Sequence, residues 1–200
     1  MDENLFLTNL CNLNNKRIIL ASRSPRRANL LKLIGLKFNV IPAEISEEIK
    51  ESDNPIDSVK RVAIEKAQWV KNKNLADLII SADTIVIKEE KMFLKPKNID
   101  DASLMLKTLS NSTHEVITAV CLLSGKQQIV VHEVSKVTFS ELSDSEIKAY
   151  IKSGEPMDKA GAYGIQGLAS IFIKKIEGCY FNVMGFPLWK FYQNLKKMKI

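Results

Sequence analysis

The sequence has few cysteines and no long apolar run, and each absence excludes a class of protein. No apolar stretch approaches the ~18 residues that a membrane-spanning helix needs. The 3 cysteines are widely spaced and form no C-x-x-C pair, so they give no framework for disulfides or for a zinc site. The chain begins acidic and lacks the basic and apolar regions of a secretory signal. We therefore expect a cytoplasmic protein that does not act at a membrane.

The composition is that of a globular domain. The 200 residues are 46% hydrophobic and 26% charged, which argues against disordered and fibrous classes. Lysine and arginine number 29 against 23 acidic residues, a net charge of +6. This excess favours partners that carry phosphate, although a lysine-rich solvated exterior is the simpler explanation. We interpret residues 1–16 as an N-terminal extension with a short helix and no chemistry, and residues 17–200 as one domain.

Apolar runs and amphipathic segments alternate along the first half of the domain, and a hairpin follows. Helices are expected to begin near residues 25, 55, 98, 144 and 186, with Ser24 as the first N-cap and a capping box at Ser143 and Glu146. The pattern predicts an α/β protein with a mixed sheet, flanking helices and two lobes around a cleft. Strands are expected at residues 17–21, 38–42, 78–87 (interrupted by polar residues), 115–123, 127–139 and 169–176.

Two arginines stand at the start of the first predicted helix, in the segment Ser24-Pro25-Arg26-Arg27. A helix N-terminus already carries partial positive charge and unpaired N–H groups, so two cations there are locally unfavourable. A bound phosphate would relieve this repulsion, with the hydroxyls of Ser22 and Ser24 as further donors. The alternative is that both arginines point outward and pair with surface carboxylates.

Two acidic positions fit phosphate chemistry that uses a metal. Asp83 ends a predicted buried strand, where a carboxylate must be paired, hydrogen-bonded or bound to metal. Glu47 and Glu48 are adjacent carboxylates that would suit Mg²⁺, which prefers oxygen ligands and few protein contacts. The alternatives are a turn aspartate that accepts backbone N–H groups and an acidic loop that is only solvated. Lys66 and Lys95 carry no signal of their own, and surface lysine is the simplest interpretation of each.

A loop with three glycines, Asp158–Gly167, contains Tyr163 and Gln166. Glycine lets the backbone approach a ligand closely, and the glutamine amide both donates and accepts, which suits the edge of a base. The alternative is a turn with a packed tyrosine. His114 and His132 lack metal-ligand spacing, so we expect both to be structural or surface residues. The sequence also lacks the P-loop and nucleophile-elbow motifs, which disfavours P-loop enzymes and ordinary serine hydrolases.

Taken together, these segments resemble the Maf family of nucleotide pyrophosphatases. They follow the order of the family and cover about residues 17–195. The sequence departs from the family pattern at two places. Arg23 stands where the dTTP/UTP branch of the family often has a small residue. Leu109-Ser110 is followed by Asn111-Ser112, whereas family members commonly have glycine after this Leu-Ser pair. The matching segments are Leu20-Ala21-Ser22-Arg23-Ser24-Pro25-Arg26-Arg27, Arg61-Val62-Ala63-x-x-Lys66-Ala67, Ala82-Asp83-Thr84, Lys95-Pro96, Thr113-His114-x-Val116-x-Thr118 and Gly161–Gly167.

The resemblance implies an elongated mixed sheet with a cleft between two lobes, similar to inosine-triphosphate pyrophosphatases. It implies a cytoplasmic hydrolase that cleaves a nucleoside triphosphate to the monophosphate and pyrophosphate. The glycine-containing loop resembles the branch that acts on dTTP and UTP, with a housecleaning role on modified pyrimidine nucleotides and a link to arrest of division. The alternatives are a 7-methyl-GTP pyrophosphatase and a non-enzymatic regulator of septum formation that binds nucleotide or nucleic acid.

The resemblance also implies roles for individual residues. Asp83 matches the catalytic acidic residue of the family, and it would act as a general base or orient the attacking water. A divalent cation, Mg²⁺ or alternatively Mn²⁺, would be held by Asp83 and Glu47. Positions tied to substrate choice and to substrate binding are matched by Arg26, Thr84, Gln166, Ser22, Ser24, Arg27, Lys66 and Lys95.

The expected partners follow from the same comparison. The substrate is a nucleoside triphosphate, and family members are often homodimers. Cationic side chains at the site would neutralise the charge that develops on the departing pyrophosphate. Nucleic acid is not an expected partner, because no basic stripe interleaved with aromatic residues is visible in the sequence.

Overall fold

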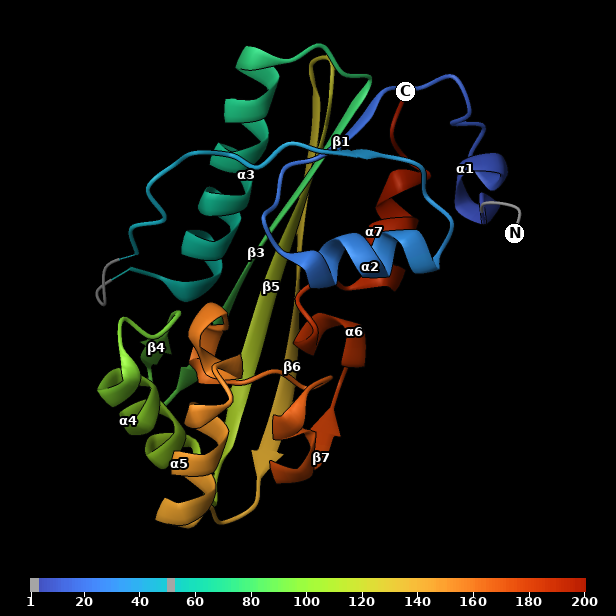
Figure 1. Ribbon diagram of the computed structural model, residues 1–200. Helices are drawn as coiled ribbons and strands as arrows, with labels where there is room; N and C mark the ends of the chain where they lie inside the picture. The colour runs from blue at the N-terminus through green and yellow to red at the C-terminus, as the bar shows by residue number, and fades with distance from the viewer. Residues whose placement is uncertain (1–3, 50–52) are drawn as a thin grey trace. The chain divides into compact units, whose positions relative to one another are not determined.

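The computed structural model describes residues 4–49 and 53–200, which form a seven-stranded mixed sheet with flanking helices (Figure 1). This confirms the predicted α/β class. None of the helices in these two ranges has both the length and the apolar character needed to cross a membrane. The strands are β1 (Ile18–Leu20), β2 (Asn39–Val40), β3 (Leu78–Lys88), β4 (Lys91–Phe93), β5 (Thr113–Ser124), β6 (Gln127–Phe139) and β7 (Ile173–Glu177). The α-helices are α1 (Phe6–Leu10), α2 (Pro25–Leu33), α3 (Pro55–Lys73), α4 (Ile99–Leu109), α5 (Asp144–Lys152), α6 (Tyr180–Val183) and α7 (Leu188–Leu195). Three short 3-10 helices are η1 (Glu155–Asp158), η2 (Ala160–Ala162) and η3 (Leu168–Phe172).

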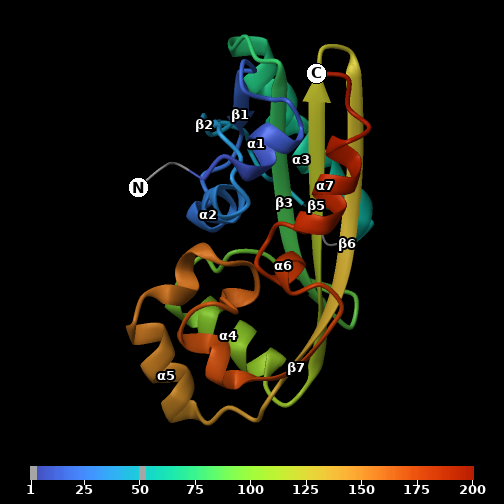
Figure 2. The same cartoon turned by 90° about the vertical axis from the view of Figure 1, so that its right-hand side faces the viewer.

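The sheet has the strand order β2-β1-β3-β5-β6-β7, and β4 pairs with β3. Strand β1 is parallel to both of its neighbours, with Ile19 opposite Asn39 on one side and Ile79 on the other. Strands β4 and β7 are antiparallel to β3 and β6, so the sheet is mixed. Figure 2 shows β5 and β6 as two long neighbouring strands joined by the predicted tight hairpin.

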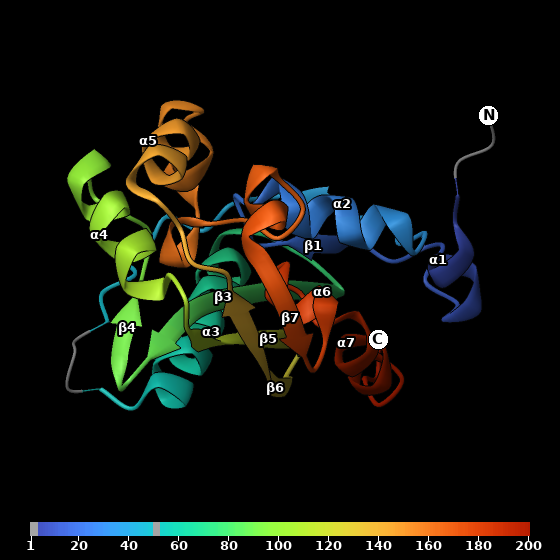
Figure 3. The same cartoon turned by 90° about the horizontal axis from the view of Figure 1, so that it is seen from below.

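The chain divides into two compact units, which we describe separately. The first contains the described residues of Met1–Asp83, Ala119–His132 and Gly185–Ile200, and the second contains Thr84–Thr118 and Glu133–Met184. The buried core of the first unit comes from β1, the start of β3 and the apolar faces of α2, α3 and α7. In the second unit, α4 and α5 pack side by side (Figure 3), and their apolar faces join the aromatic core.

Three helices begin at a residue that the sequence marks as a cap. The side chains of Asn54 and Asn98 accept backbone N–H groups at the starts of α3 and α4. Ser143 and Glu146 form the predicted capping box of α5. Ser24 is the N-cap of α2 by position, as predicted, but its side chain makes no capping hydrogen bond.

The structure corrects two expectations about strands. β3 runs unbroken from Leu78 to Lys88, so Asp83 lies inside the strand and not at its end. The polar residues are tolerated there because they have partners: Ser81 donates to the Ala63 carbonyl, and Asp83 pairs with Lys66. The segment predicted as a strand from residue 169 begins instead as η3, and only Ile173–Glu177 is a strand.

The N-terminal extension forms a short helix, α1, that packs against the end of α2. The Leu7 and Thr8 N–H groups donate to the carbonyls of Ile34 and Gly35, and the Thr8 hydroxyl also donates to Gly35. A side chain at Gly35 would collide with the Phe6 backbone, and its φ of +73° lies in the left-handed region. Glycine is therefore required where α1 approaches the end of α2.

His114 lies on β5 in the core of the second unit and is only 2% exposed. Its ring makes edge contacts with Phe139 and Tyr163, and its Nε2 lies 2.7 Å from the Tyr163 hydroxyl. Burial, with a smaller contribution from the charge of Lys88, lowers the pKa of His114 from 6.5 to about 4. This histidine is a structural residue, as the sequence predicted.

The lowered pKa of His114 predicts a loss of stability in mild acid. Between pH 6.5 and about 4 the unfolded chain binds a proton that the folded chain does not, so stability falls as pH falls through this window. The full effect of this group is on the order of 3 kcal/mol. We expect the difference in unfolding free energy between wild type and His114→Gln to shrink from pH 7 to pH 4, as measured by urea denaturation. A His114→Gln curve parallel to wild type would contradict the assignment.

Candidate active site

The first unit brings together Lys66, Asp83 and Glu47 from three separate segments. The Lys66 ammonium nitrogen lies 2.8 Å from Asp83 Oδ1 and 2.9 Å from Glu47 Oε1. The side chains of Lys66 and Asp83 are 8% and 9% exposed, whereas that of Glu47 is 43% exposed. A buried ammonium therefore contacts one buried carboxylate and one that reaches the solvent.

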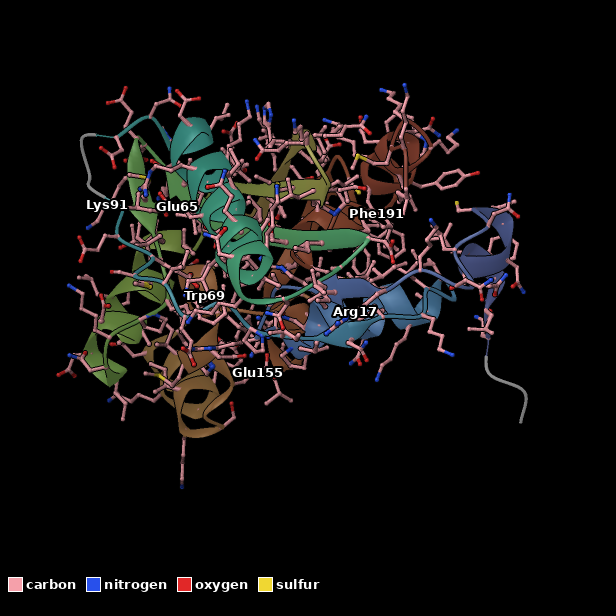
Figure 4. The ribbon with its side chains drawn as sticks, turned by 90° about the horizontal axis from the view of Figure 1, so that it is seen from above. Arg17, Glu65, Trp69, Lys91, Glu155 and Phe191 are labelled. Carbon is pink, nitrogen blue, oxygen red and sulfur yellow. The ribbon has the colours of Figure 1, made fainter. Side chains whose placement is uncertain are left out.

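Helix α3 directs Lys66 inward because this residue falls in its apolar stripe. The stripe contains Val59, Val62, Ala63, Ala67 and Val70, all of which are buried. The neighbouring residues Glu65 and Trp69 are only half-buried (Figure 4), with Glu65 paired to Arg61 and Trp69 contacted by the ammonium of Lys73. A lysine in this stripe is thus not the surface residue that its type alone suggests.

Arg27 is buried and its guanidinium is occupied by the protein itself. Its Nε donates to the Gly185 carbonyl, and its Nη1 donates to the carbonyl of Ala82 and the hydroxyl of Ser22. Burial lowers the pKa of Arg27, while the carboxylates of Asp83 and Glu47 act in the opposite direction. Arg27 therefore connects the backbone at Gly185 with the backbone at Ala82, which directly precedes Asp83.

Arg26 lies next to this arrangement, half-buried on the first turn of α2. Its charge lowers the pKa of Arg27, which indicates that the two guanidinium groups are close. The predicted arginine pair thus contains one buried residue, Arg27, and one half-buried residue, Arg26.

Ser22 is positioned to donate a hydrogen bond. Its oxygen accepts hydrogen bonds from the Ser24 N–H, at 3.1 Å, and from Arg27 Nη1, at 3.3 Å. Because both contacts use its lone pairs, the hydroxyl hydrogen remains for another acceptor. Among the described residues no side chain caps the start of α2. The backbone N–H groups of its first turn and the Ser22 hydroxyl are therefore hydrogen-bond donors in the same segment.

The charges of this cluster favour binding of an anion together with a metal cation. Lys66 contacts the carboxylates of Asp83 and Glu47, and Arg27 interacts electrostatically with both carboxylates and with Arg26. Three cations thus accompany two carboxylates, an excess of one positive charge (3 − 2). Residues 4–49 and 53–200 contain no group of three or more His, Cys, Asp or Glu side chains placed to hold a metal. The two carboxylates nevertheless converge on a single cationic atom, and one or two carboxylates are what Mg²⁺ uses beside substrate phosphates.

Three of the predicted site residues belong to the second unit. Thr84 follows Asp83 directly in β3, is partly buried and lies 2.9 Å from the Thr118 hydroxyl on β5. Lys95 is exposed between β4 and α4. The Gln166 side chain is exposed and makes no hydrogen bond with the described parts of the chain.

The loop that carries Gln166 is fixed by its backbone. The Gly161 N–H donates to the Leu94 carbonyl, and the φ of +68° at Gly161 lies in the left-handed region. A Cβ at Gly161 would also lie 2.9 Å from a Val86 methyl carbon, closer than real contacts allow. Tyr163 is buried against His114, so the packed-tyrosine interpretation is correct for this residue.

Sequence reasoning missed Glu155, which anchors the other end of this loop (labelled in Figure 4). Its carboxylate accepts hydrogen bonds from the Tyr150 hydroxyl and the Leu168 N–H, both at 2.9 Å. A Cβ at Gly167 would collide with this carboxylate, so the glycine backbone lies directly against it. Gln166 is therefore flanked by a buried Ile165 and a backbone held by Glu155. The sequence feature that could have indicated this role is a glutamate shortly before a loop with several glycines.

Comparison with known proteins extends over nearly all of this chain. The family model described as Maf-like protein matches residues 17–198. A dTTP/UTP pyrophosphatase of Syntrophomonas wolfei is 48% identical over 180 residues, 89% of this chain and 95% of that protein. A protein of the same name from Carboxydothermus hydrogenoformans is 49% identical and matches 90% of this chain and 98% of its own length. Another, from Aquifex aeolicus, is 44% identical and matches 92% of this chain and 96% of its own length. Because the family model covers residues 17–198 and these relatives match most of the chain, the chain belongs to the Maf family.

Proposed function

We propose that this protein is a nucleoside triphosphate pyrophosphatase that hydrolyses dTTP and UTP to the monophosphate and pyrophosphate. The observation that carries the proposal is the convergence of Asp83 and Glu47 on the Lys66 ammonium, beside Arg27 and Ser22. Such a cluster offers oxygen ligands for a cation and donors for phosphate oxygens in one place. The names of the relatives support the choice of dTTP and UTP over 7-methyl-GTP.

Asp83 is the residue that acts on the attacking water. Its Oδ1 is held by Lys66, which leaves Oδ2 to accept a hydrogen bond or a proton from water. The water oxygen attacks the α-phosphorus, the bond to the bridging oxygen breaks, and pyrophosphate departs. Lys66 thus sets the direction of the carboxylate as well as its charge balance.

The remaining residues act on the phosphates. The Ser22 hydroxyl hydrogen and the Arg26 guanidinium bind phosphate oxygens, with the N–H groups at the start of α2 as further donors. Arg27 contributes through its charge and by fixing Ser22 and the Ala82 carbonyl. Arg26 also neutralises the charge that develops on the departing pyrophosphate.

Asp83 and Glu47 fit a divalent cation, Mg²⁺ in the first instance. Both are carboxylates that already share one cationic neighbour, and hard oxygen ligands are what this ion prefers. The ion would supply positive charge to the phosphate oxygens when bound. A cytoplasmic location and a homodimer belong to the proposal as well; the three free thiols, Cys11, Cys121 and Cys179, support a reducing compartment.

Asp83→Asn tests the assignment of the water-activating residue. The amide oxygen can still accept from Lys66, but it cannot take a proton, so we expect pyrophosphate release to fall by at least ~10²-fold. Binding of a non-hydrolysable UTP analogue, followed by calorimetry, should persist. Asp77→Asn is the matched control, because Asp77 just precedes the same strand and its carboxylate accepts the Arg17 N–H. Turnover near the wild-type rate in folded Asp83→Asn would remove this residue from the mechanism.

Adjacent glutamates provide a matched test of cation binding. Glu47 pairs with Lys66, whereas Glu48 contacts the Ser46 hydroxyl and is exposed. Glu47→Gln removes one of two carboxylates, so the Mg²⁺ concentration for half-maximal activity should rise by about tenfold or more. Glu48→Gln should leave this concentration unchanged. Mn²⁺ binding, measured by electron paramagnetic resonance, should weaken in the first variant alone. Equal effects in the two variants would exclude Glu47 as a ligand.

A further inference from the structure

The four residues Gly164–Gly167 form a tight turn that presents Gln166 to the solvent. The Gly167 N–H donates to the Gly164 carbonyl at 3.1 Å, which closes the turn. Of the two residues in between, Ile165 is buried, whereas Gln166 is exposed. The turn therefore fixes one of its central side chains in the protein and offers the amide of the other to a ligand.

The side chains of Glu155 and Tyr150 hold this turn at both of its ends. One oxygen of the Glu155 carboxylate accepts the Leu168 N–H directly after the turn, and the other accepts the Tyr150 hydroxyl, both at 2.9 Å. Burial and Glu155 raise the pKa of Tyr150, while a hydrogen bond from the Gly164 backbone, at the start of the turn, acts in the opposite direction. The carboxylate and the phenol thus connect the residue that begins the turn with the residue that follows it.

Side chains also fill the space beside both glycines of the turn. A Cβ at Gly167 would collide with the Glu155 carboxylate, and a Cβ at Gly164 would lie 2.7 Å from the Cε atom of Lys159. The Lys159 ammonium in turn donates to the Glu155 carbonyl and to the Asp158 carboxylate, both at 2.6 Å. The backbone of the turn is therefore packed against Glu155 at one end and against Lys159 at the other.

An ordered backbone matters for a side chain as long as that of Gln166. Fixing such a side chain on a ligand costs conformational entropy, and a mobile backbone beneath it would add to that cost. Because Glu155 and Tyr150 already order the turn, a ligand that binds Gln166 has to order only the side chain.

We propose that Glu155 and Tyr150 are positioning residues that hold the Gly164–Gly167 turn so that Gln166 binds the nucleoside triphosphate. The inference rests on the proposed function, which supplies the substrate. The Gln166 amide offers a donor and an acceptor together, which match the carbonyl and N–H groups on the edge of uracil or thymine. Glu155 and Tyr150 act on this amide only through the backbone that they hold.

The decisive experiment is a double-mutant cycle on the binding of a non-hydrolysable UTP analogue, measured by calorimetry. Glu155→Ala removes the acceptor of the Leu168 N–H, so affinity should fall by roughly 2- to 10-fold, the range for one hydrogen bond. Gln166→Ala should weaken binding to a similar extent. The double variant should bind no more weakly than Gln166→Ala alone, because Glu155 acts through Gln166. A general structural effect would instead multiply the two losses.

Two milder variants keep the test valid even if Glu155→Ala does not fold. Tyr150→Phe removes only the hydroxyl and keeps the ring against Phe172, and it should weaken binding only when Gln166 is present. In Glu155→Gln, the amide oxygen can accept the Leu168 N–H and the amide N–H can donate to the Tyr150 hydroxyl. This variant should therefore retain most of the wild-type affinity.

Steady-state kinetics separates positioning from catalysis. Glu155→Ala and Gln166→Ala should raise KM for UTP and leave kcat within about twofold, because the turn holds substrate while Asp83 acts on the water. Glu177→Ala is the matched control, since it removes an exposed glutamate of the same unit that pairs with Lys175. It should change neither constant.

Three results would overturn the inference. These are losses that multiply in the double variant, unchanged binding in Gln166→Ala, and wild-type affinity in folded Glu155→Ala or Tyr150→Phe although amide hydrogens at residues 164–168 exchange faster. A failure of the proposed function would look different: wild type itself would release no pyrophosphate from UTP or dTTP, whichever residue stands at position 155.

Discussion

The buried ammonium of Lys66 is the charge around which the first unit is organised. Moving such a group out of water costs several kcal/mol, and this is offset only when partners of opposite charge are held in good geometry. Asp83 and Glu47 supply those partners from β3 and from the segment that follows β2. Helix α3, strand β3 and the acidic segment are therefore fixed at one point. The loss of either carboxylate would leave part of that charge uncompensated in the interior.

The two adjacent arginines, Arg26 and Arg27, have different surroundings although they belong to one sequence motif. Successive residues on a helix point about 100° apart, so Arg26 and Arg27 cannot face the same surroundings. Arg27 points into the unit, where it bonds Gly185, Ala82 and Ser22. In the proposed function, Arg27 therefore acts on phosphate indirectly, through its charge and through the Ser22 hydroxyl that it contacts. Arg26 is the arginine of the pair that is nearer to solvent.

The elements that depend on local interactions could be predicted from the sequence, and those that depend on distant partners could not. The capping box at Ser143 and the hairpin before Gln127 involve residues within a few positions of each other. The unbroken course of β3 through Asp83 depends on Lys66, which lies 17 residues earlier. Likewise, η3 begins where Glu155, 13 residues away, accepts the Leu168 N–H. No pattern within a short window contains either contact.

The same limit applied to the site. Residue types and the resemblance predicted Asp83, Glu47 and Lys66 as site residues, but their mutual geometry was invisible in a sequence that separates them by up to 36 positions (83 − 47). Phosphate oxygens accept from any donor and attract any cation, so a cluster of charges suffices for them. A pyrimidine edge presents donors and acceptors together, and the sequence alone does not show which hydrogens the side chains around it can offer.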